Sequence, residues 1–112
     1  MKYRGCGFIQ NINRKKVYTL SKPYMLTYDL NSPGQNYDEV IKTIENDIST
    51  VCCKYWESSY LFRSNLTTKQ MIDKLKPYLD KGDRFFITEI VNNKTGWLTP
   101  SQWDFINENI YD

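Results

Sequence analysis

The chain has 112 residues, of which 40% are hydrophobic and 25% charged, and a formal net charge of +2. This length suffices for one domain with one core, and the composition is that of an ordinary soluble globular protein. No apolar run approaches the roughly 18 residues of a membrane span. The N-terminal residues also contain no apolar stretch as long as that of a signal peptide. We therefore expect a cytoplasmic protein without membrane contact.

The residue types that are missing narrow the chemistry. The chain has no histidine, and its three cysteines include no Cys-x-x-Cys pair. A structural zinc site lacks ligands, and a serine or cysteine triad of the usual kind lacks its base. Catalysis would have to use carboxylates, with a hard metal such as Mg²⁺. The adjacent Cys52 and Cys53 are expected to be small buried apolar groups rather than nucleophiles.

Residues 1–22 form a basic N-terminal extension that holds six of the 15 cations and none of the 13 acids. The other 90 residues carry nine cations and 13 acids, a net charge of −4. Two β-prone runs at 7–12 and 16–20 flank a polar turn, which predicts a hairpin. We expect this extension to bind phosphate or an acidic protein surface through four cations: Arg14, Lys15, Lys16 and Lys22. The alternative is a solvated leader folded against its own acidic body.

The main domain begins with a β-prone run at residues 24–30, which predicts a strand buried on both faces. Turn residues at 31–34 end this strand. A helix is expected over residues 37–48, with Asn36 as its N-cap and Glu39 as the capping-box partner. Its apolar positions share one helical face, which predicts packing against the sheet.

Two further β-prone runs, 51–56 and 59–63, predict a hairpin that turns at Glu57 and Ser58. Large apolar side chains alternate onto both of its faces. Since the helices can cover only one face, the other needs a different cover, and we expect a homodimer. Trp56, Tyr60 and Phe62 are expected to pack in the core or in that dimer; stacking on nucleic-acid bases is the alternative.

The last elements carry clear boundary signals. A capping box of Thr67 and Gln70 predicts the second helix, whose last turn Pro77 should separate. A turn at 80–83 precedes a strand at 85–91, and turn chemistry explains Asp80 and Asp83 better than a cation site. Thr99, followed by proline, predicts a short final helix. Its expected anchors on the body are Trp97, Trp103 and Ile106.

The order strand, helix, strand, strand, helix, strand predicts an α+β fold of the ferredoxin-like βαββαβ type. Residues 23–112 would form this domain together with the C-terminal helix, and residues 1–22 would add the N-terminal hairpin.

The stretch Tyr28–Tyr37, with the sequence YDLNSPGQNY, resembles the opening of the small SinR-like proteins, which are relatives of the CRISPR-associated protein 2 family. The stretches 56–62, 76–80 and 83–87 fit the same pattern in the same order. This resemblance implies a small ferredoxin-like dimer of a prokaryotic or phage defence system. It also implies a candidate Mg²⁺ site at Asp29, because the matching aspartate supports nuclease activity in some members, whereas others act only as scaffolds.

Asp29 is the best single candidate for chemistry, since it lies where a strand meets a loop. As a metal ligand it would need substrate phosphates or a symmetry mate, and the alternative is an acceptor of N–H groups from the turn at 31–34. We favour a non-catalytic dimeric module that contacts nucleic acid or a protein of a nucleic-acid-processing or defence complex. The alternatives are an Mg²⁺-dependent endonuclease that uses Asp29, and an inhibitor or adaptor that acts by protein contact.

Overall fold

The computed structural model describes residues 21–30 and 36–111, and the expected N-terminal hairpin lies outside these ranges. The elements follow one another as β1 (Lys22–Asp29), α2 (Tyr37–Lys42), β2 (Val51–Trp56), β3 (Ser59–Ser64), α3 (Thr68–Leu75), β4 (Arg84–Glu89) and α4 (Pro100–Phe105). Each of the helices α2, α3 and α4 continues with a different pitch. α2 and α4 continue as π-helical turns at Thr43–Ile48 and Ile106–Ile110, and α3 continues as a 3₁₀ turn at Lys76–Tyr78.

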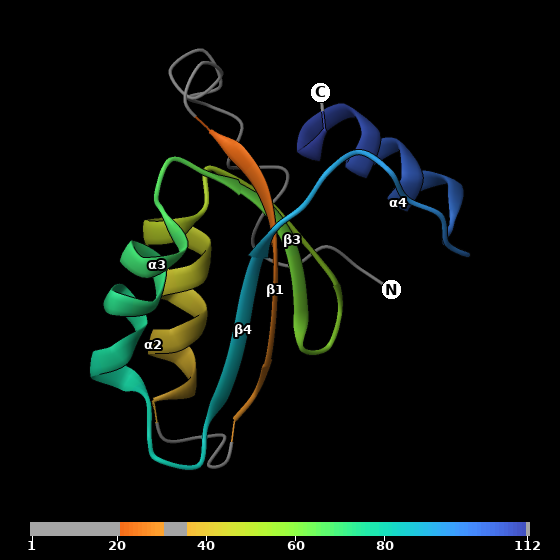
Figure 1. Ribbon diagram of the computed structural model, residues 1–112. Helices are drawn as coiled ribbons and strands as arrows, with labels where there is room; N and C mark the ends of the chain where they lie inside the picture. The colour runs from red at the N-terminus through yellow and green to blue at the C-terminus, as the bar shows by residue number, and fades with distance from the viewer. Residues whose placement is uncertain (1–20, 31–35, 112) are drawn as a thin grey trace.

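The strands form one four-stranded sheet in the order β2-β3-β1-β4, and every neighbouring pair is antiparallel. In the centre of this sheet, Leu26 lies opposite Tyr60 on one side and Ile87 on the other. With its helices, the chain is an α+β protein, as the sequence predicts (Figure 1).

The core lies between the sheet and α2 and α3, which both pack on one face of it (Figure 1). The rings of Tyr24 and Phe62 stack there with centroids 5.6 Å apart, and those of Tyr28 and Phe85 with centroids 5.4 Å apart. Each large buried side chain contributes roughly 1.5–3 kcal/mol to folding. The predicted burial of the first strand on both faces is wrong, because only alternate residues of β1 are fully buried.

The helix boundaries test the capping predictions. The side chains of Thr67 and Gln70 each bond the other's main-chain N–H group, at 3.1 and 2.9 Å, and the predicted capping box is confirmed. The capping box predicted at Asn36 is wrong, since its side chain makes no cap bond. Asn36 has φ −85° and ψ 21° rather than the extended conformation that aims a cap side chain at the helix.

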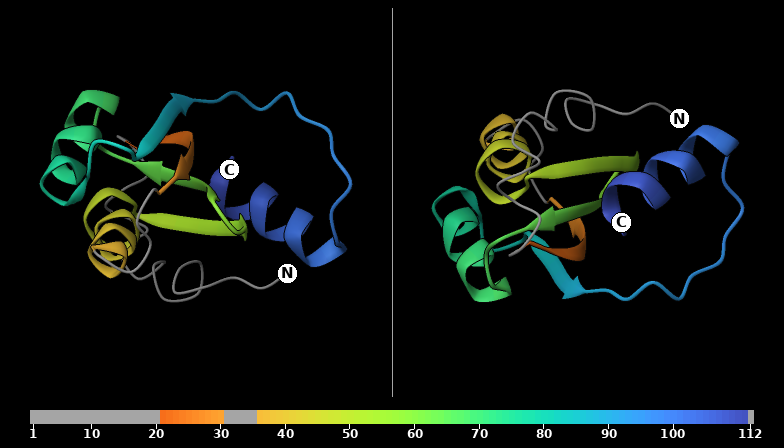
Figure 2. Two further views of the ribbon diagram at one scale, coloured as in Figure 1. Left: turned by 90° about the horizontal axis from the view of Figure 1, so that it is seen from below. Right: turned by 90° about the horizontal axis from the view of Figure 1, so that it is seen from above.

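The C-terminal helix, α4 and its continuation, packs on the opposite face of the sheet from α2 and α3 (Figure 2). Thr99 caps the start of this helix as expected, and its bonds with Gln102 complete a capping box. Ile106 and Ile110 are buried against β2 and β3. Trp97 is not an anchor, because its side chain is 99% exposed. The segment between β4 and α4 arches away from the sheet at this point (Figure 2).

Candidate functional site

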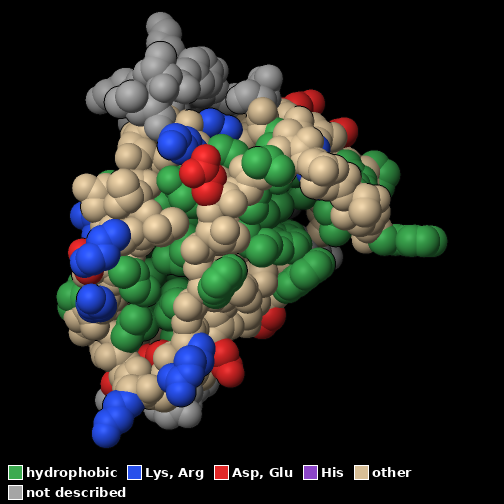
Figure 3. All heavy atoms as spheres, viewed as in Figure 1, with side chains coloured by type: hydrophobic (Ala, Val, Ile, Leu, Met, Phe, Trp, Pro, Cys, Tyr) green, Lys and Arg blue, Asp and Glu red, His purple; other side chains and the backbone are tan. Residues whose placement is uncertain are grey.

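The outer face of the sheet, the face without α2 and α3, carries a cavity of about 510 Å³. It lies between the sheet, the arching segment and the C-terminal helix, and we call it the outer-face chamber. Its volume falls within the range of small-molecule pockets. Hydrophobic side chains are exposed across the middle of the molecule and beside the C-terminal helix in Figure 3. Five aromatic side chains contribute to the lining of the chamber: Tyr55, Trp56, Trp97, Trp103 and Tyr111.

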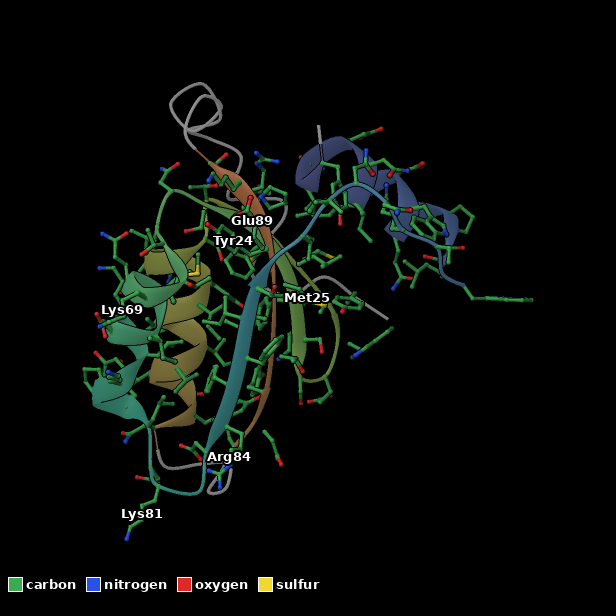
Figure 4. The ribbon with its side chains drawn as sticks, in the orientation of Figure 1. Tyr24, Met25, Lys69, Lys81, Arg84 and Glu89 are labelled. Atoms are coloured by element: carbon green, nitrogen blue, oxygen red, sulfur yellow. The ribbon has the colours of Figure 1, made fainter. Side chains whose placement is uncertain are left out.

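The sheet supplies the floor of the chamber. Met25 of β1 and Leu61 of β3 lie directly opposite each other in the sheet register, and both side chains line the cavity. Figure 4 shows Met25 on the side of the sheet that faces the C-terminal helix. The hydroxyl group of Tyr55 donates to Sδ of Met25 at 3.6 Å, which orients the phenol along the floor.

A β-bulge brings Tyr55 and Trp56 to the same cavity. The pairing of β2 with β3 shifts register between Lys54 and Trp56, so strict alternation ends there. The ring centroids of Tyr55 and Trp56 lie 4.3 Å apart, and Trp56 is 58% exposed. Strict alternation along β2 would place Trp56 on the same face as Cys52 and Lys54, which are buried in the core. The register shift brings its side chain to the chamber instead, so Trp56 does not pack in the core.

One cation faces the chamber. Of the described residues that line it, Lys94 alone is charged. Its Nζ atom lies 4.4 Å from the ring centroid of Tyr111 and donates to Oδ1 of Asn92. Burial raises the pKa of Tyr55 and of Tyr111, so both phenols stay protonated at neutral pH. The chamber therefore presents aromatic faces, neutral hydroxyl groups and a single positive charge.

Asp29 lies at a different place, the end of β1 beside β4. It is exposed and lies opposite Arg84 in the register, at a shallow hollow of about 250 Å³. Nη1 of Arg84 donates to the carbonyl oxygens of Lys81 and Asp83, at 3.0 and 2.9 Å (Figure 4). Asp29 is the only carboxylate among the described residues that line this hollow.

The residues around Asp29 fit a bound Mg²⁺ only if further ligands come from outside them. Among residues 21–30 and 36–111, no group of three or more His, Cys, Asp and Glu is placed to hold a metal ion. Substrate phosphates or the same aspartate of a second copy would have to complete the coordination. The alternative role, as an acceptor for the turn at 31–34, falls outside the described residues.

The other predicted binding residues do not gather in one place. Lys22 is exposed at the start of β1, at the opposite end of that strand from Asp29. Arg14, Lys15 and Lys16 lie outside the described residues. The chamber itself was not predicted as a site, because its lining comes from segments far apart in the sequence.

The structural interpretations of several residues are confirmed. Asp83 accepts a hydrogen bond of 2.8 Å from the main-chain N–H of Asp80, as turn chemistry predicts. Cys53 is a fully buried free thiol, and burial raises its pKa to about 12, which removes its thiolate at neutral pH. Cys52 is fully buried too, but it is disulfide-bonded rather than the free apolar group that the sequence predicts. Tyr60 and Phe62 are fully buried against the helices and cannot stack on a ligand.

The chain matches none of the protein-family models, curated proteins or solved structures with which it was compared. In the part of the chain that the structure describes, every helix is too short or too polar to cross a bilayer.

Proposed function

We propose that this chain is a non-catalytic, ferredoxin-like module of the CRISPR-associated protein 2 type that binds single-stranded nucleic acid on the outer face of its sheet. The finer fold assignment is supported by the strand order β2-β3-β1-β4 and by the two helices on one face. The binding assignment rests on the aromatic side chains that this outer face leaves exposed.

Two large rings carry the proposal. Trp56 and Trp97 are 58% and 99% exposed, and both line the outer-face chamber. Exposed rings of this size are unfavourable in water and mark interaction sites when they gather on one part of a surface. Bases of a single strand stack on such rings, and each stacked base contributes roughly 1–3 kcal/mol.

The charge of the N-terminal extension complements these rings. Six cations without an acid in residues 1–22 attract the phosphate backbone, while the rings bind the bases. A protein partner of a nucleic-acid-processing complex would use the same rings without the same salt dependence. Salt dependence therefore separates the two kinds of partner.

The experiment measures fluorescence anisotropy of labelled single-stranded and duplex oligonucleotides with the full-length protein over a salt series. We expect the single strand to bind more tightly, and Trp97→Ala to weaken it about tenfold. The control is Val91→Ala, which removes an exposed apolar side chain from the same segment without removing a ring. If no oligonucleotide binds even at low salt, the proposal is wrong and an adaptor that acts by protein contact takes its place.

A homodimer remains part of the proposal. The C-terminal helix covers the β2 and β3 side of the outer face, and the exposed Phe86 of the edge strand β4 marks the free side. Light scattering should give twice the chain mass of 13.4 kDa, and Phe86→Glu should give the single mass. A single mass for the parent protein at micromolar concentration would contradict the dimer.

A further inference from the structure

We infer that the outer-face chamber binds one unpaired nucleotide of the strand, with its base among the aromatic rings and its phosphate on Lys94. This inference rests on the proposed function and names the part of the ligand that the module encloses.

The lining of the chamber suits a planar ring. Trp56 comes from the end of β2, Trp103 from α4 and Tyr111 from the residue after the C-terminal helix, so aromatic rings from different elements line the cavity. At about 510 Å³ the cavity has room for a base with its sugar. Stacking between aromatic side chains is the usual way in which proteins hold an unpaired base.

The polar groups of the chamber predict little selection among bases. The Tyr55 hydroxyl is already donated to Met25, and the remaining lining is mostly apolar. A base would therefore be held by its faces rather than read by hydrogen bonds along its edge. Stacking strength would then set the preference among bases, and that preference should be modest.

The single charge selects an anionic ligand. Lys94 is exposed, lines the chamber and meets no carboxylate among the other lining residues. Its ammonium group, held over the Tyr111 ring, is a compact charge that can pair with a phosphate oxygen at the mouth of the cavity. A neutral planar ligand would offer no negative charge to pair with the ammonium group of Lys94.

A paired base cannot enter such a cavity. Extruding a base from a duplex costs a few kcal/mol, whereas a base of a single strand is already free to turn outward. The chamber therefore explains in physical terms why the module should prefer single strands.

Gly96 offers a way to close the chamber without removing a ring. A Cβ atom at this position would lie 3.6 Å from Cζ2 of Trp103, an ordinary contact distance, so a larger side chain would extend against the indole. Gly96→Leu should narrow the cavity, and Gly96→Ala should do so less.

The test uses a single-stranded oligonucleotide that contains one 2-aminopurine, whose fluorescence falls when it stacks, and the same strand with an abasic site. With the parent protein we expect quenching, and about tenfold weaker binding of the abasic strand. Gly96→Leu should abolish both effects, and Lys94→Gln should weaken binding several-fold. The control, Lys69→Gln, removes the same charge from the helix layer on the other side of the sheet (Figure 4) and should change neither.

The outcomes separate this inference from the proposed function. If strands bind but Gly96→Leu keeps the parent affinity and quenching, the chamber is not the base site while the binding function stands. If no strand binds, both are wrong. Adenosine monophosphate, tested alone, should bind much more weakly than the strand; equal affinity would assign the chamber to a free nucleotide instead. Circular dichroism of each variant checks that the fold is intact.

Discussion

Arg63 of β3 donates a hydrogen bond of 2.6 Å from Nη1 to the carbonyl oxygen of Ile110, in the last turn of the C-terminal helix. The same guanidinium donates from Nε to the hydroxyl of Ser21 at 2.9 Å and from Nη2 to its carbonyl oxygen at 2.6 Å. A cation at the carboxyl end of a helix also complements the helix dipole. One side chain thus joins the start of β1 and the end of the helix to the centre of the sheet.

Replacing Arg63 should therefore loosen the C-terminal helix. Arg63→Met leaves the carbonyl groups of Ser21 and Ile110 without their donor, and we expect the free energy of unfolding to fall by roughly 2–3 kcal/mol. Urea unfolding measures this loss. Lys69→Met, a control on the exposed face of α3, should keep the parent midpoint. An unchanged midpoint for Arg63→Met would contradict the role assigned to this residue.

The buried thiol of Cys53 predicts a loss of stability in alkali. Burial raises its pKa from 9.0 to about 12, so the folded protein holds this proton more tightly than the unfolded chain. This contribution to stability is fully present below pH 9.0 and disappears as the pH rises towards about 12. Urea unfolding at pH 8 and pH 10.5 should show a larger fall for the parent than for Cys53→Ala.

Tyr60 also contributes to the loss of stability in alkali, which is why the parent is compared with Cys53→Ala. Its burial and the nearby Glu45 raise the pKa of the phenol, which adds an alkaline loss of the same sign in both proteins. That loss cancels in the difference between parent and variant. Equal falls for the two proteins would mean that Cys53 is not the group that titrates.

The response of the parent protein and of Asp29→Ala to Mg²⁺ distinguishes the binding proposal from an endonuclease. We expect Asp29→Ala to fold and to cost about 1 kcal/mol at most, the value of one hydrogen bond to a turn. Under the binding proposal, added Mg²⁺ should not raise the melting temperature of either protein. A rise present in the parent and absent in the variant, together with Mg²⁺-dependent cleavage of RNA or DNA, would support the endonuclease instead.

The basic extension should dominate contact with phosphate. Deleting residues 1–20 removes five cations and no acid and changes the net charge from +2 to −3. The deletion stops at residue 20 because Ser21 bonds Arg63 and Lys22 begins β1. We expect the remaining domain to fold and its nucleic-acid binding to vanish, as measured by circular dichroism and anisotropy.

A smaller change tests the centre of that extension. Replacing Arg14, Lys15 and Lys16 with glutamine should remove most of the salt dependence, since each phosphate contact on a single strand contributes a slope of roughly −0.7 in log affinity against log salt. An unchanged slope would locate the phosphate contacts elsewhere on the protein.

Local patterns in the sequence predicted the α+β class and the order of its helices and strands. Two capping boxes, at Thr67 and at Thr99, depend only on residues three positions apart, and both are present. Asn36 and Glu39 have the same spacing, but the side chain of Asn36 makes no cap hydrogen bond because its main chain adopts a different conformation. Element order and strand boundaries also follow from local periodicity, to within two residues at most strand ends.

The chamber could not be predicted in this way. Its lining joins Met25, Tyr55 and Trp103, which lie far apart in the sequence and meet only through the sheet register and the packing of the C-terminal helix. Trp56 reaches it through a bulge that alternation does not show. The one available signal was the aromatic content of the two segments, Tyr55–Trp56 and 97–111, which no periodic pattern explained.

Arg63 holds the C-terminal helix on the sheet through its hydrogen bond to Ile110, and the chamber exists only while this helix is docked there. If the helix leaves the sheet, the cavity loses Trp103 and Tyr111, so only molecules with the helix docked on the sheet would bind the nucleotide. The observed dissociation constant would then be the intrinsic constant divided by the fraction of molecules whose helix is docked. Ligand binding and helix docking are thus thermodynamically linked, so weakening the arginine would lower affinity at a site that it does not line.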